Sequence, residues 1–133
     1  LEESDEFGLH KGLGLVKGRV ELFPGDMVVE TGYGSERSPE RLKVPHMGWN
    51  SITKRRESRL LEGIPDGEHF YFVHSYYAAP SVADSSATLT TTNYGIDFTS
   101  SIEVDNMWAV QFHPEKSQSA GLRVLENFSR IDK

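Results

Sequence analysis

Apolar and polar residues alternate along this chain in short blocks that are typical of β-strands. The blocks are rich in β-branched or aromatic residues and are bounded by glycine, proline, asparagine or aspartate. They predict strands at residues 19–23, 42–49, 70–77, 87–94, 97–104 and 107–112. Because Pro45 cannot donate a ladder hydrogen bond, the second strand is expected at a sheet edge or a bend. The almost continuously apolar run 70–77 is typical of a strand buried on both faces.

The spacing of apolar residues changes near the carboxy terminus, where it fits a helix. After Ser117 they form a stripe suited to a helix that covers a sheet, made of Ala120, Leu122, Val124, Leu125 and Phe128. Asp105-Asn106 supplies hairpin-turn chemistry before the last strand. The pattern therefore predicts a strand-rich α/β domain that closes with a helix.

Two polar segments separate the strands. Residues 24–41 contain three glycines and two prolines among mixed charges, which predicts an exposed loop. Residues 51–61 predict a helical turn or short helix, with a solvated basic face formed by Lys54, Arg55, Arg56 and Arg59. No repeat divides the chain, so residues 1–133 are expected to form one domain.

Composition narrows the classes of function. With 37% hydrophobic residues, 133 residues can bury one core, and a net charge of −6 repels phosphate backbones and anionic membrane surfaces. We therefore expect neither nucleic acid nor membrane as a partner. Apolar runs are short and the amino terminus is acidic, which predicts a cytoplasmic protein. The chain has no cysteine, so it cannot supply a disulfide, a zinc thiolate or a thiol nucleophile.

The candidate chemistry lies where the last strand ends. Pro114 stiffens the turn after His113, and Glu115 follows within reach of a ring nitrogen. A histidine base and a carboxylate that orients it are two members of a nucleophilic triad. A His-x-Glu pair after a strand is also common as a plain surface pair, so these residues alone leave both interpretations open.

Other catalytic arrangements have weaker support. Ser75 and Ser117 are the candidate hydroxyls, but a serine nucleophile needs a nearby base and an oxyanion hole. The remaining candidate ligands, His46, His74, His113 and Glu115, lack any local metal-ligand spacing. Neither a metal nor a cofactor is expected.

Three segments together carry a resemblance: Val-Pro-His-Met-Gly-Trp-Asn at 44–50, Phe-Val-His-Ser-Tyr at 72–76 and Gln-Phe-His-Pro-Glu-Lys-Ser at 111–117. In this order they resemble the class I, or triad-type, glutamine amidotransferases, whose domain is a flavodoxin-like α/β fold. Residues 45–50 and Tyr-Gly-Ile-Asp-Phe at 94–98 are similar to the glutaminase subunit of imidazole glycerol phosphate synthase. The resemblance covers about residues 1–128.

The resemblance implies roles for particular residues. In that family glutamine is hydrolysed, and the ammonia passes through a cyclase barrel subunit to a histidine precursor. His113 matches the general base and Glu115 its orienting carboxylate, while the segment of His74, Ser75 and Tyr76 is expected against glutamine, chiefly through its backbone. Positions expected to face the cyclase are Pro45, His46, Met47, Gly48, Trp49, Asn50 and Lys116. For His46, His74 and Trp49, plain packing in the protein interior remains an alternative.

The sequence also departs from the family pattern in features that bear on activity. Its cysteine lies in a Gly-x-Cys-x-Gly elbow, and residues 2–8 resemble the sequence just after that elbow. The resemblance therefore implies an incomplete, carboxy-terminal portion of the domain that is inactive alone, with residues 24–41 longer than the family suggests. Missing strands would leave apolar faces of residues 70–77 and 107–112 exposed, which favours a homo-oligomer or a complementing amino-terminal fragment. The alternatives are a non-catalytic interaction module and an amidotransferase that serves another acceptor.

Overall fold

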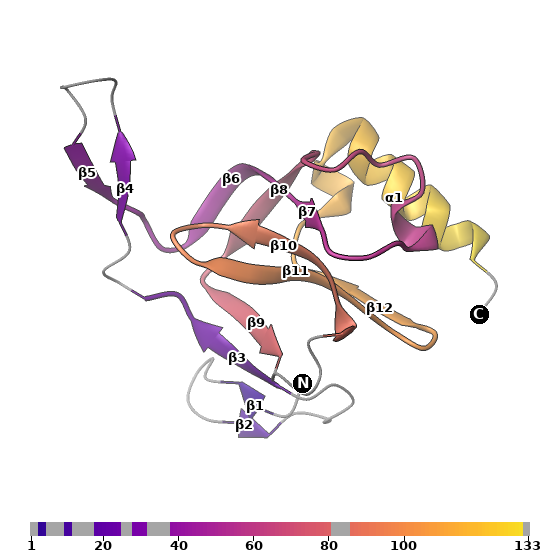
Figure 1. The fold of residues 1–133 in the computed structure, drawn as a ribbon, viewed down its shortest axis with the longest axis horizontal. Helices are drawn as coiled ribbons and strands as arrows, with labels where there is room; N and C mark the ends of the chain where they lie inside the picture. The colour runs from indigo at the N-terminus through magenta and orange to yellow at the C-terminus, as the bar shows by residue number, and fades with distance from the viewer. Residues whose placement is uncertain are drawn as a thin grey trace.

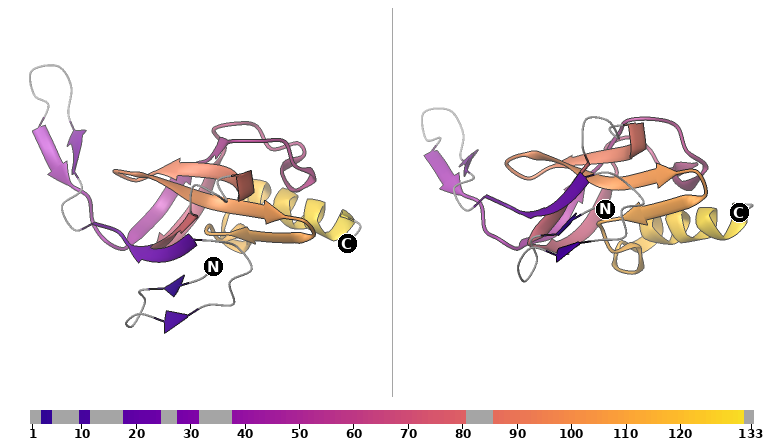
Figure 2. Two further views of the ribbon diagram at one scale, coloured as in Figure 1. Left: turned by 60° about the horizontal axis from the view of Figure 1, so that its bottom comes forward. Right: turned by 90° about the horizontal axis from the view of Figure 1, so that it is seen from below.

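The computed structural model describes residues 3–4, 10–11, 18–24, 28–31, 38–80 and 86–131. The residues given above as 2–8 and 24–41 are thus only partly described. Short strands make up most of the described chain, and a single described α-helix, α1 (Gln118–Arg130), lies at one end of the molecule (Figure 1). The two further views keep α1 at the end opposite the hairpin of β4 (Val28–Thr31) and β5 (Ser38–Arg41) (Figure 2).

The larger sheet has the strand order β2-β1-β3-β9-β11-β10-β7, and β12 pairs with β11 outside this path. The β1–β3 pair is parallel, whereas every other described pair in this sheet is antiparallel. Its strands are β1 (Glu3–Ser4), β2 (His10–Lys11), β3 (Gly18–Leu22), β7 (Thr53–Lys54), β9 (Tyr76–Pro80), β10 (Thr88–Asn93), β11 (Asp97–Val104) and β12 (Met107–Val110). The strands predicted at 19–23, 87–94, 97–104 and 107–112 are confirmed within one or two residues at most ends.

A separate two-stranded ladder, β6 (His46–Ser51) with β8 (His69–His74), packs beside the larger sheet. The prediction of one strand over 70–77 is wrong, because the chain leaves this ladder at Ser75 and enters the larger sheet as β9. The prediction that this strand is buried on both faces is also wrong. Phe70 and Phe72 are 0% exposed, whereas the residues between and after them are half-buried. Because aromatic residues also occupy half-buried positions, the alternation of buried and half-buried residues along β8 could not be recognised in the sequence.

The core lies between β8, β11 and α1. Phe70 and Phe112 pack with ring centroids 4.2 Å apart, and Phe72 contacts both Phe98 and Phe112. Since Phe70, Phe72 and Phe112 are at most 2% exposed, the expectation that residues 70–77 and 107–112 would lack cover is wrong for these core side chains. Among the described residues, the large exposed apolar side chains instead lie elsewhere and are Leu22, Val44, Met47, Trp49, Leu122, Leu125 and Phe128.

The predicted helix is confirmed, but its buried face differs from the predicted stripe. Gly121, Val124 and Asn127 are buried, whereas Leu122 and Leu125 are 66% and 43% exposed. Positions 121, 124 and 127 recur at the i, i+3 spacing that shares one helix face. The inward amide of Asn127 donates to the carbonyl oxygens of Leu60 (2.9 Å) and Glu62 (2.8 Å), so a polar side chain replaces an apolar one there.

Two connecting segments differ from the sequence prediction. Residues 24–41, expected as a loop, include a hairpin of β4 (Val28–Thr31) and β5 (Ser38–Arg41), and Pro39 lies within it, opposite Glu30. Residues 51–61 are extended where a helix was expected, apart from the 3-10 turn η2 (Arg59–Leu61). Ser58 caps this turn by accepting from the backbone N–H of Leu60.

Proline and turn residues act largely as predicted. The strand expected over 42–49 begins only at His46, directly after Pro45, whose missing N–H cannot join a ladder. The hairpin turn at Asp105-Asn106 is confirmed, because Val104 pairs with Met107 across it. Within the described residues, no helix has both the length and the apolar character needed to cross a bilayer.

Candidate active site

The side chains of His113 and Glu115 contact each other in the segment that follows β12. His113 Nδ1 lies 2.8 Å from Glu115 Oε1, and both side chains are partly open to solvent, at 38% and 59% exposed. The hydrogen bond from its own backbone N–H, followed by the bond from His113, lowers the pKa of Glu115, so this carboxyl is ionised at neutral pH. An ionised carboxylate only accepts, so Nδ1 must donate, and the neutral ring keeps a free lone pair on Nε2. This arrangement can take a proton from a reacting group.

The backbone around His113 is fixed from two sides. Its N–H donates to the carbonyl oxygen of Tyr71 (2.9 Å) in β8, and its carbonyl oxygen accepts from Ser117 Oγ (2.7 Å). Ser117 Oγ also accepts from the backbone N–H of Tyr71 (2.9 Å), and the side chain is 1% exposed. Its hydroxyl is therefore committed to joining β8 to the 3-10 turn η4 (Pro114–Lys116). Ser117 is thus a structural residue and not the candidate nucleophile considered above.

A glycine allows the helix to approach this turn. A Cβ on Gly121 would lie 1.8 Å from the carbonyl oxygen of Pro114 and 2.9 Å from Ser117 Cβ. The position therefore has no room for a side chain, and α1 packs directly on the turn that carries the candidate base. Sequence reasoning did not identify Ser117 or Gly121 in these roles, although a glycine within a helical pattern often marks such close packing.

The segment predicted to bind substrate lies where the chain changes sheets. Ser75 separates β8 from β9, and its carbonyl oxygen accepts from the backbone N–H of Phe23 (3.0 Å). His74 Nδ1 lies 2.8 Å from the carbonyl oxygen of Tyr76, so a second bond spans Ser75. His113 lies close enough to His74 for its charge to lower the pKa of that ring, after the larger effect of burial. The structure thus brings the 74–76 segment and the His113 turn to the same region.

His46 corrects part of the predicted partner surface. Its side chain is 2% exposed and contacts His74, with His46 Nδ1 3.0 Å from His74 Nε2, so it cannot face a partner. Burial, and then the charge of His74, lowers the pKa of His46 to about 4. The alternation of β6 turns Met47 and Trp49 outward at 62% and 48% exposed. Of the other predicted interface positions, Pro45 and Lys116 are exposed, and Gly48 and Asn50 are half-buried.

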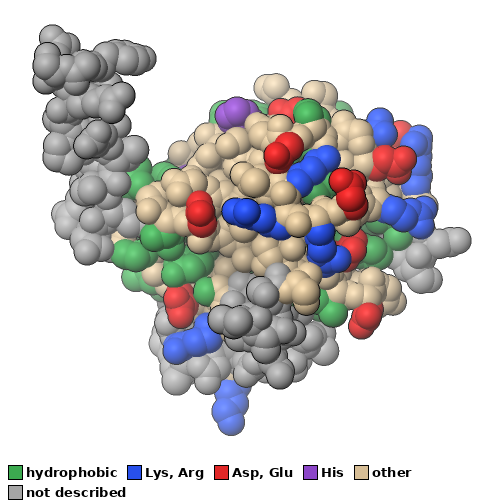
Figure 3. Space-filling model, in the orientation of Figure 1, with side chains coloured by type: hydrophobic (Ala, Val, Ile, Leu, Met, Phe, Trp, Pro, Cys, Tyr) green, Lys and Arg blue, Asp and Glu red, His purple; other side chains and the backbone are tan. Residues whose placement is uncertain are grey.

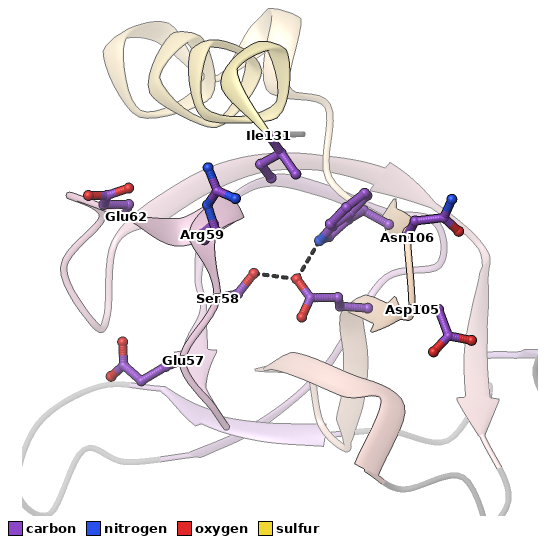
Figure 4. Close-up of a pocket in the computed structure, with 9 residues that line it drawn as sticks. Glu57, Ser58, Arg59, Glu62, Asp105, Asn106 and Ile131 are labelled. Atoms are coloured by element: carbon purple, nitrogen blue, oxygen red, sulfur yellow. Dashed lines mark hydrogen bonds between the residues drawn. The ribbon is translucent and has the colours of Figure 1, made fainter. Parts of the chain in front are cut away.

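One hollow among the described residues lies away from this region, between η2 and the β11–β12 hairpin. It has a volume of about 780 Å³ and is lined by Glu57, Ser58, Arg59, Glu62, Glu103, Asp105, Asn106, Trp108 and Ile131 (Figure 4). Its central carboxylate, Glu103, accepts from Ser58 Oγ (2.6 Å) and from Trp108 Nε1 and is paired with Arg56. These bonds make Glu103 part of the framework. Among the described residues, no group of three acidic or histidine side chains is arranged to hold a metal ion.

The charges on the visible face give no single-sign surface. Acidic and basic side chains are interspersed over the described part of this face, with apolar side chains between them (Figure 3). The space-filling view therefore shows no continuous basic stripe of the kind that follows a phosphate backbone.

Comparison with known proteins identifies related sequences. Residues 12–131 match the family model described as Glutamine amidotransferase class-I. The protein named imidazole glycerol phosphate synthase subunit HisH from Syntrophotalea carbinolica is 49% identical over 126 residues, which cover 95% of this chain and 56% of that protein. The same-named protein of Aquifex aeolicus is 48% identical over 129 residues, covering 97% of this chain and 54% of its own. The chain spans about half the length of the curated relatives it matches.

Proposed function

Because this chain belongs to the class I glutamine amidotransferase family, we propose that it supplies the general base and the orienting carboxylate of a glutaminase. The nucleophile would be a cysteine in another stretch of polypeptide, since this chain has none. The observation that carries the proposal is the 2.8 Å contact of His113 Nδ1 with the ionised Glu115. It leaves Nε2 as the atom that accepts a proton.

In the proposed reaction His113 accepts a proton twice and returns it twice. Nε2 takes the proton of the thiol, and the resulting thiolate attacks the carboxamide carbon of glutamine. The imidazolium then returns the proton to the leaving nitrogen, so that ammonia departs and a thioester remains. Nε2 next takes a proton from water, whose oxygen attacks the thioester, and the cysteine recovers its proton as glutamate leaves. Glu115 holds the ring in one tautomer and stabilises its cationic form throughout.

The name of the relatives supports a proposal for the pathway that uses the ammonia. Their name, imidazole glycerol phosphate synthase subunit HisH, supports a role in histidine biosynthesis beside a cyclase subunit. The exposed residues that would face this cyclase are Pro45, Met47, Trp49 and Lys116. Exposed aromatic and methionine side chains are enriched at protein interfaces, which supports this assignment.

The polypeptide that supplies the cysteine would also cover apolar residues that are exposed in this chain. Leu122 and Leu125 lie on the outer face of α1, 66% and 43% exposed. Their exposure supports either a complementing amino-terminal half or a second copy of the chain as their cover. Size-exclusion chromatography with light scattering separates these outcomes, and a clean monomer at micromolar concentration that binds no such half would contradict both.

A non-catalytic interaction module is the second candidate. The observation in its favour is the absence of cysteine from all 133 residues. Such a module would keep the exposed β6 surface without performing hydrolysis.

Reconstitution distinguishes the two functions. The chain is mixed with a cysteine-bearing amino-terminal fragment of a class I glutamine amidotransferase, assembly is verified by size exclusion, and ammonia release from glutamine is measured. We expect release that disappears in His113→Ala and falls in Glu115→Gln. The matched controls are His69→Ala and Glu126→Gln, both exposed, which should keep the activity. An assembled complex that releases no ammonia would contradict the glutaminase and support the interaction module.

A further inference from the structure

Two histidines outside the proposed catalytic pair form a continuous hydrogen-bonded relay. The antiparallel register of β6 and β8 places His46 opposite His74. His46 Nδ1 lies 3.0 Å from His74 Nε2, and His74 Nδ1 lies 2.8 Å from the carbonyl oxygen of Tyr76. At the other end, Asn50 Nδ2 lies 3.3 Å from His46 Nε2. The relay thus runs from β6 to the first residue of β9.

The chemistry of its ends fixes the direction of every bond. A carbonyl oxygen only accepts, so His74 Nδ1 donates to Tyr76, and the neutral ring then accepts at Nε2. His46 must therefore donate from Nδ1 and accept at Nε2. The amide of Asn50 has the matching orientation, because its nitrogen also donates to the carbonyl oxygen of Asn93 (2.8 Å) and its oxygen accepts from the backbone N–H of Ser51 (2.8 Å). With both rings neutral, each carries its proton on Nδ1.

An additional proton breaks the relay at either ring. On His74 it would add an Nε2–H that faces the Nδ1–H of His46. On His46 it would face the N–H of Asn50. Burial, the largest cause in both cases, lowers the pKa of each ring. The neutral forms are therefore favoured on geometric and on electrostatic grounds.

Aromatic rings surround the pair and offer no counter-charge. Tyr94 stacks on His46 with centroids 4.0 Å apart, and Phe72 stacks on it at 5.0 Å. Phe23 and Phe98 each lie 5.1 Å from His74. Among the described residues, the titratable groups facing the pair are Tyr94 on His46 and the ring of His113 toward His74. Neither carries a negative charge near neutral pH that would stabilise a protonated histidine.

We propose that His46 is a positioning residue that fixes the backbone of residues 74–76 through His74. Ser75 alone joins β8 to β9, and the bond from His74 to Tyr76 spans it. The relay orients the ring that makes this bond, and protonation of either ring breaks the contact between the two rings or the contact of His46 with Asn50. Naming the crossover a glutamine-binding segment rests on the proposed function, whereas the relay itself does not. The geometry thus adds to the proposed site a support that acts on substrate binding more than on chemistry.

Nitrogen-15 NMR of the histidine rings tests the relay directly in this chain. At pH 7 we expect both rings as the Nδ1–H tautomer, and on acidification both should titrate at lower pH than the histidines of the urea-unfolded chain. An Nε2–H tautomer at either ring, or titration together with the unfolded reference, overturns the relay. This experiment needs neither a cysteine nor a partner, so its failure is distinguishable from failure of the proposed function.

Variants test the positioning role. His46→Phe keeps the aromatic volume but removes the donor to His74 Nε2, so the Nε2 signal of His74 and the amide signals of residues 75–76 should shift. In the reconstituted glutaminase we expect a rise of about tenfold in KM for glutamine with kcat changed by less than about twofold. His46→Gln can donate to His74, so its KM for glutamine should lie much nearer the wild-type value than that of His46→Phe. If His46→Phe does not fold, the wild-type titration decides; unchanged KM and unchanged signals in a folded variant contradict the proposal.

Discussion

Gly121 lies where α1 crosses the η4 turn, and Gly121→Ala should weaken the fold and disturb the candidate base. The added Cβ would lie 1.8 Å from the carbonyl oxygen of Pro114 and 2.7 Å from its carbon. Both are backbone atoms, and the Pro114 oxygen already accepts from the N–H of Ser117 (3.1 Å). The turn therefore cannot move without breaking the bonds that hold His113.

Two opposing effects decide the magnitude. Alanine is favoured over glycine inside a helix by about 1 kcal/mol. Forcing a methyl group into a closely packed site costs about 1–3 kcal/mol, and more when the obstacle is backbone. Because the overlap at Pro114 exceeds 1 Å relative to an ordinary contact distance of about 3.4 Å, the steric cost should dominate. We expect a net loss of roughly 1–2 kcal/mol in the free energy of unfolding.

Urea denaturation followed by circular dichroism measures this loss. Ser119→Ala is the matched control, since Ser119 is exposed in the same first turns of α1 and should change stability by less than about 0.5 kcal/mol. In the reconstituted glutaminase, Gly121→Ala should also reduce ammonia release. A Gly121→Ala chain as stable as wild type, or more stable, would refute the close packing of α1 on the turn.

The remaining predictions concern other parts of the structure. Because burial lowers the pKa of His46 from 6.5 to about 4, its contribution to the free energy of unfolding should be complete above about pH 6.5 and decrease as the pH falls toward 4. In urea titrations, His46→Phe should reduce the loss of stability between pH 7 and pH 5 by about 2 kcal/mol, while the lowered pKa of His74 still contributes to that loss. Leu122→Asp, on the exposed face of α1, should leave the isolated chain's stability within about 0.5 kcal/mol but weaken association seen by light scattering; unchanged association would exclude that face as an interface. Asn127→Ala removes both donors to the carbonyl oxygens of residues 60 and 62 and should cost about 2 kcal/mol in urea, whereas the exposed Ser129→Ala should cost little.

Local patterns predicted the strand-and-helix outline well. The β10, β11 and β12 strands follow β-branched runs with clear turn residues, and α1 follows a helical repeat, so each is set by nearby sequence. The family match confirms the expected α/β fold class. The break at Ser75 was missed because aromatic residues fill both faces of the run 70–77. Of the helical turn or short helix predicted over residues 51–61, only the 3-10 turn η2 forms, because tertiary pairing of β7 with β10 outweighs a modest local preference.

Some contacts of the candidate site could likewise be predicted from local sequence, whereas others depend on the folded chain. His113 and Glu115 are two residues apart, so local sequence could place them together. The contact of His46 with His74 joins residues 28 positions apart and depends on the register of two strands, which the pattern does not specify. Ser117 was considered only as a hydroxyl, because its bonds to two different backbone segments exist only in the folded chain.

The rate of alkylation of the nucleophilic cysteine as a function of pH tests most directly whether His113 accepts a proton from a thiol. The measurement uses this chain assembled with the cysteine-bearing half of a relative, iodoacetamide as the probe and mass spectrometry to follow that one cysteine. A neighbouring imidazole lowers a thiol pKa below its ordinary value of about 8.5. We predict a midpoint well below 8.5 that moves back toward it in His113→Ala and stays in place in His69→Ala. Identical profiles for wild type and His113→Ala would contradict the account.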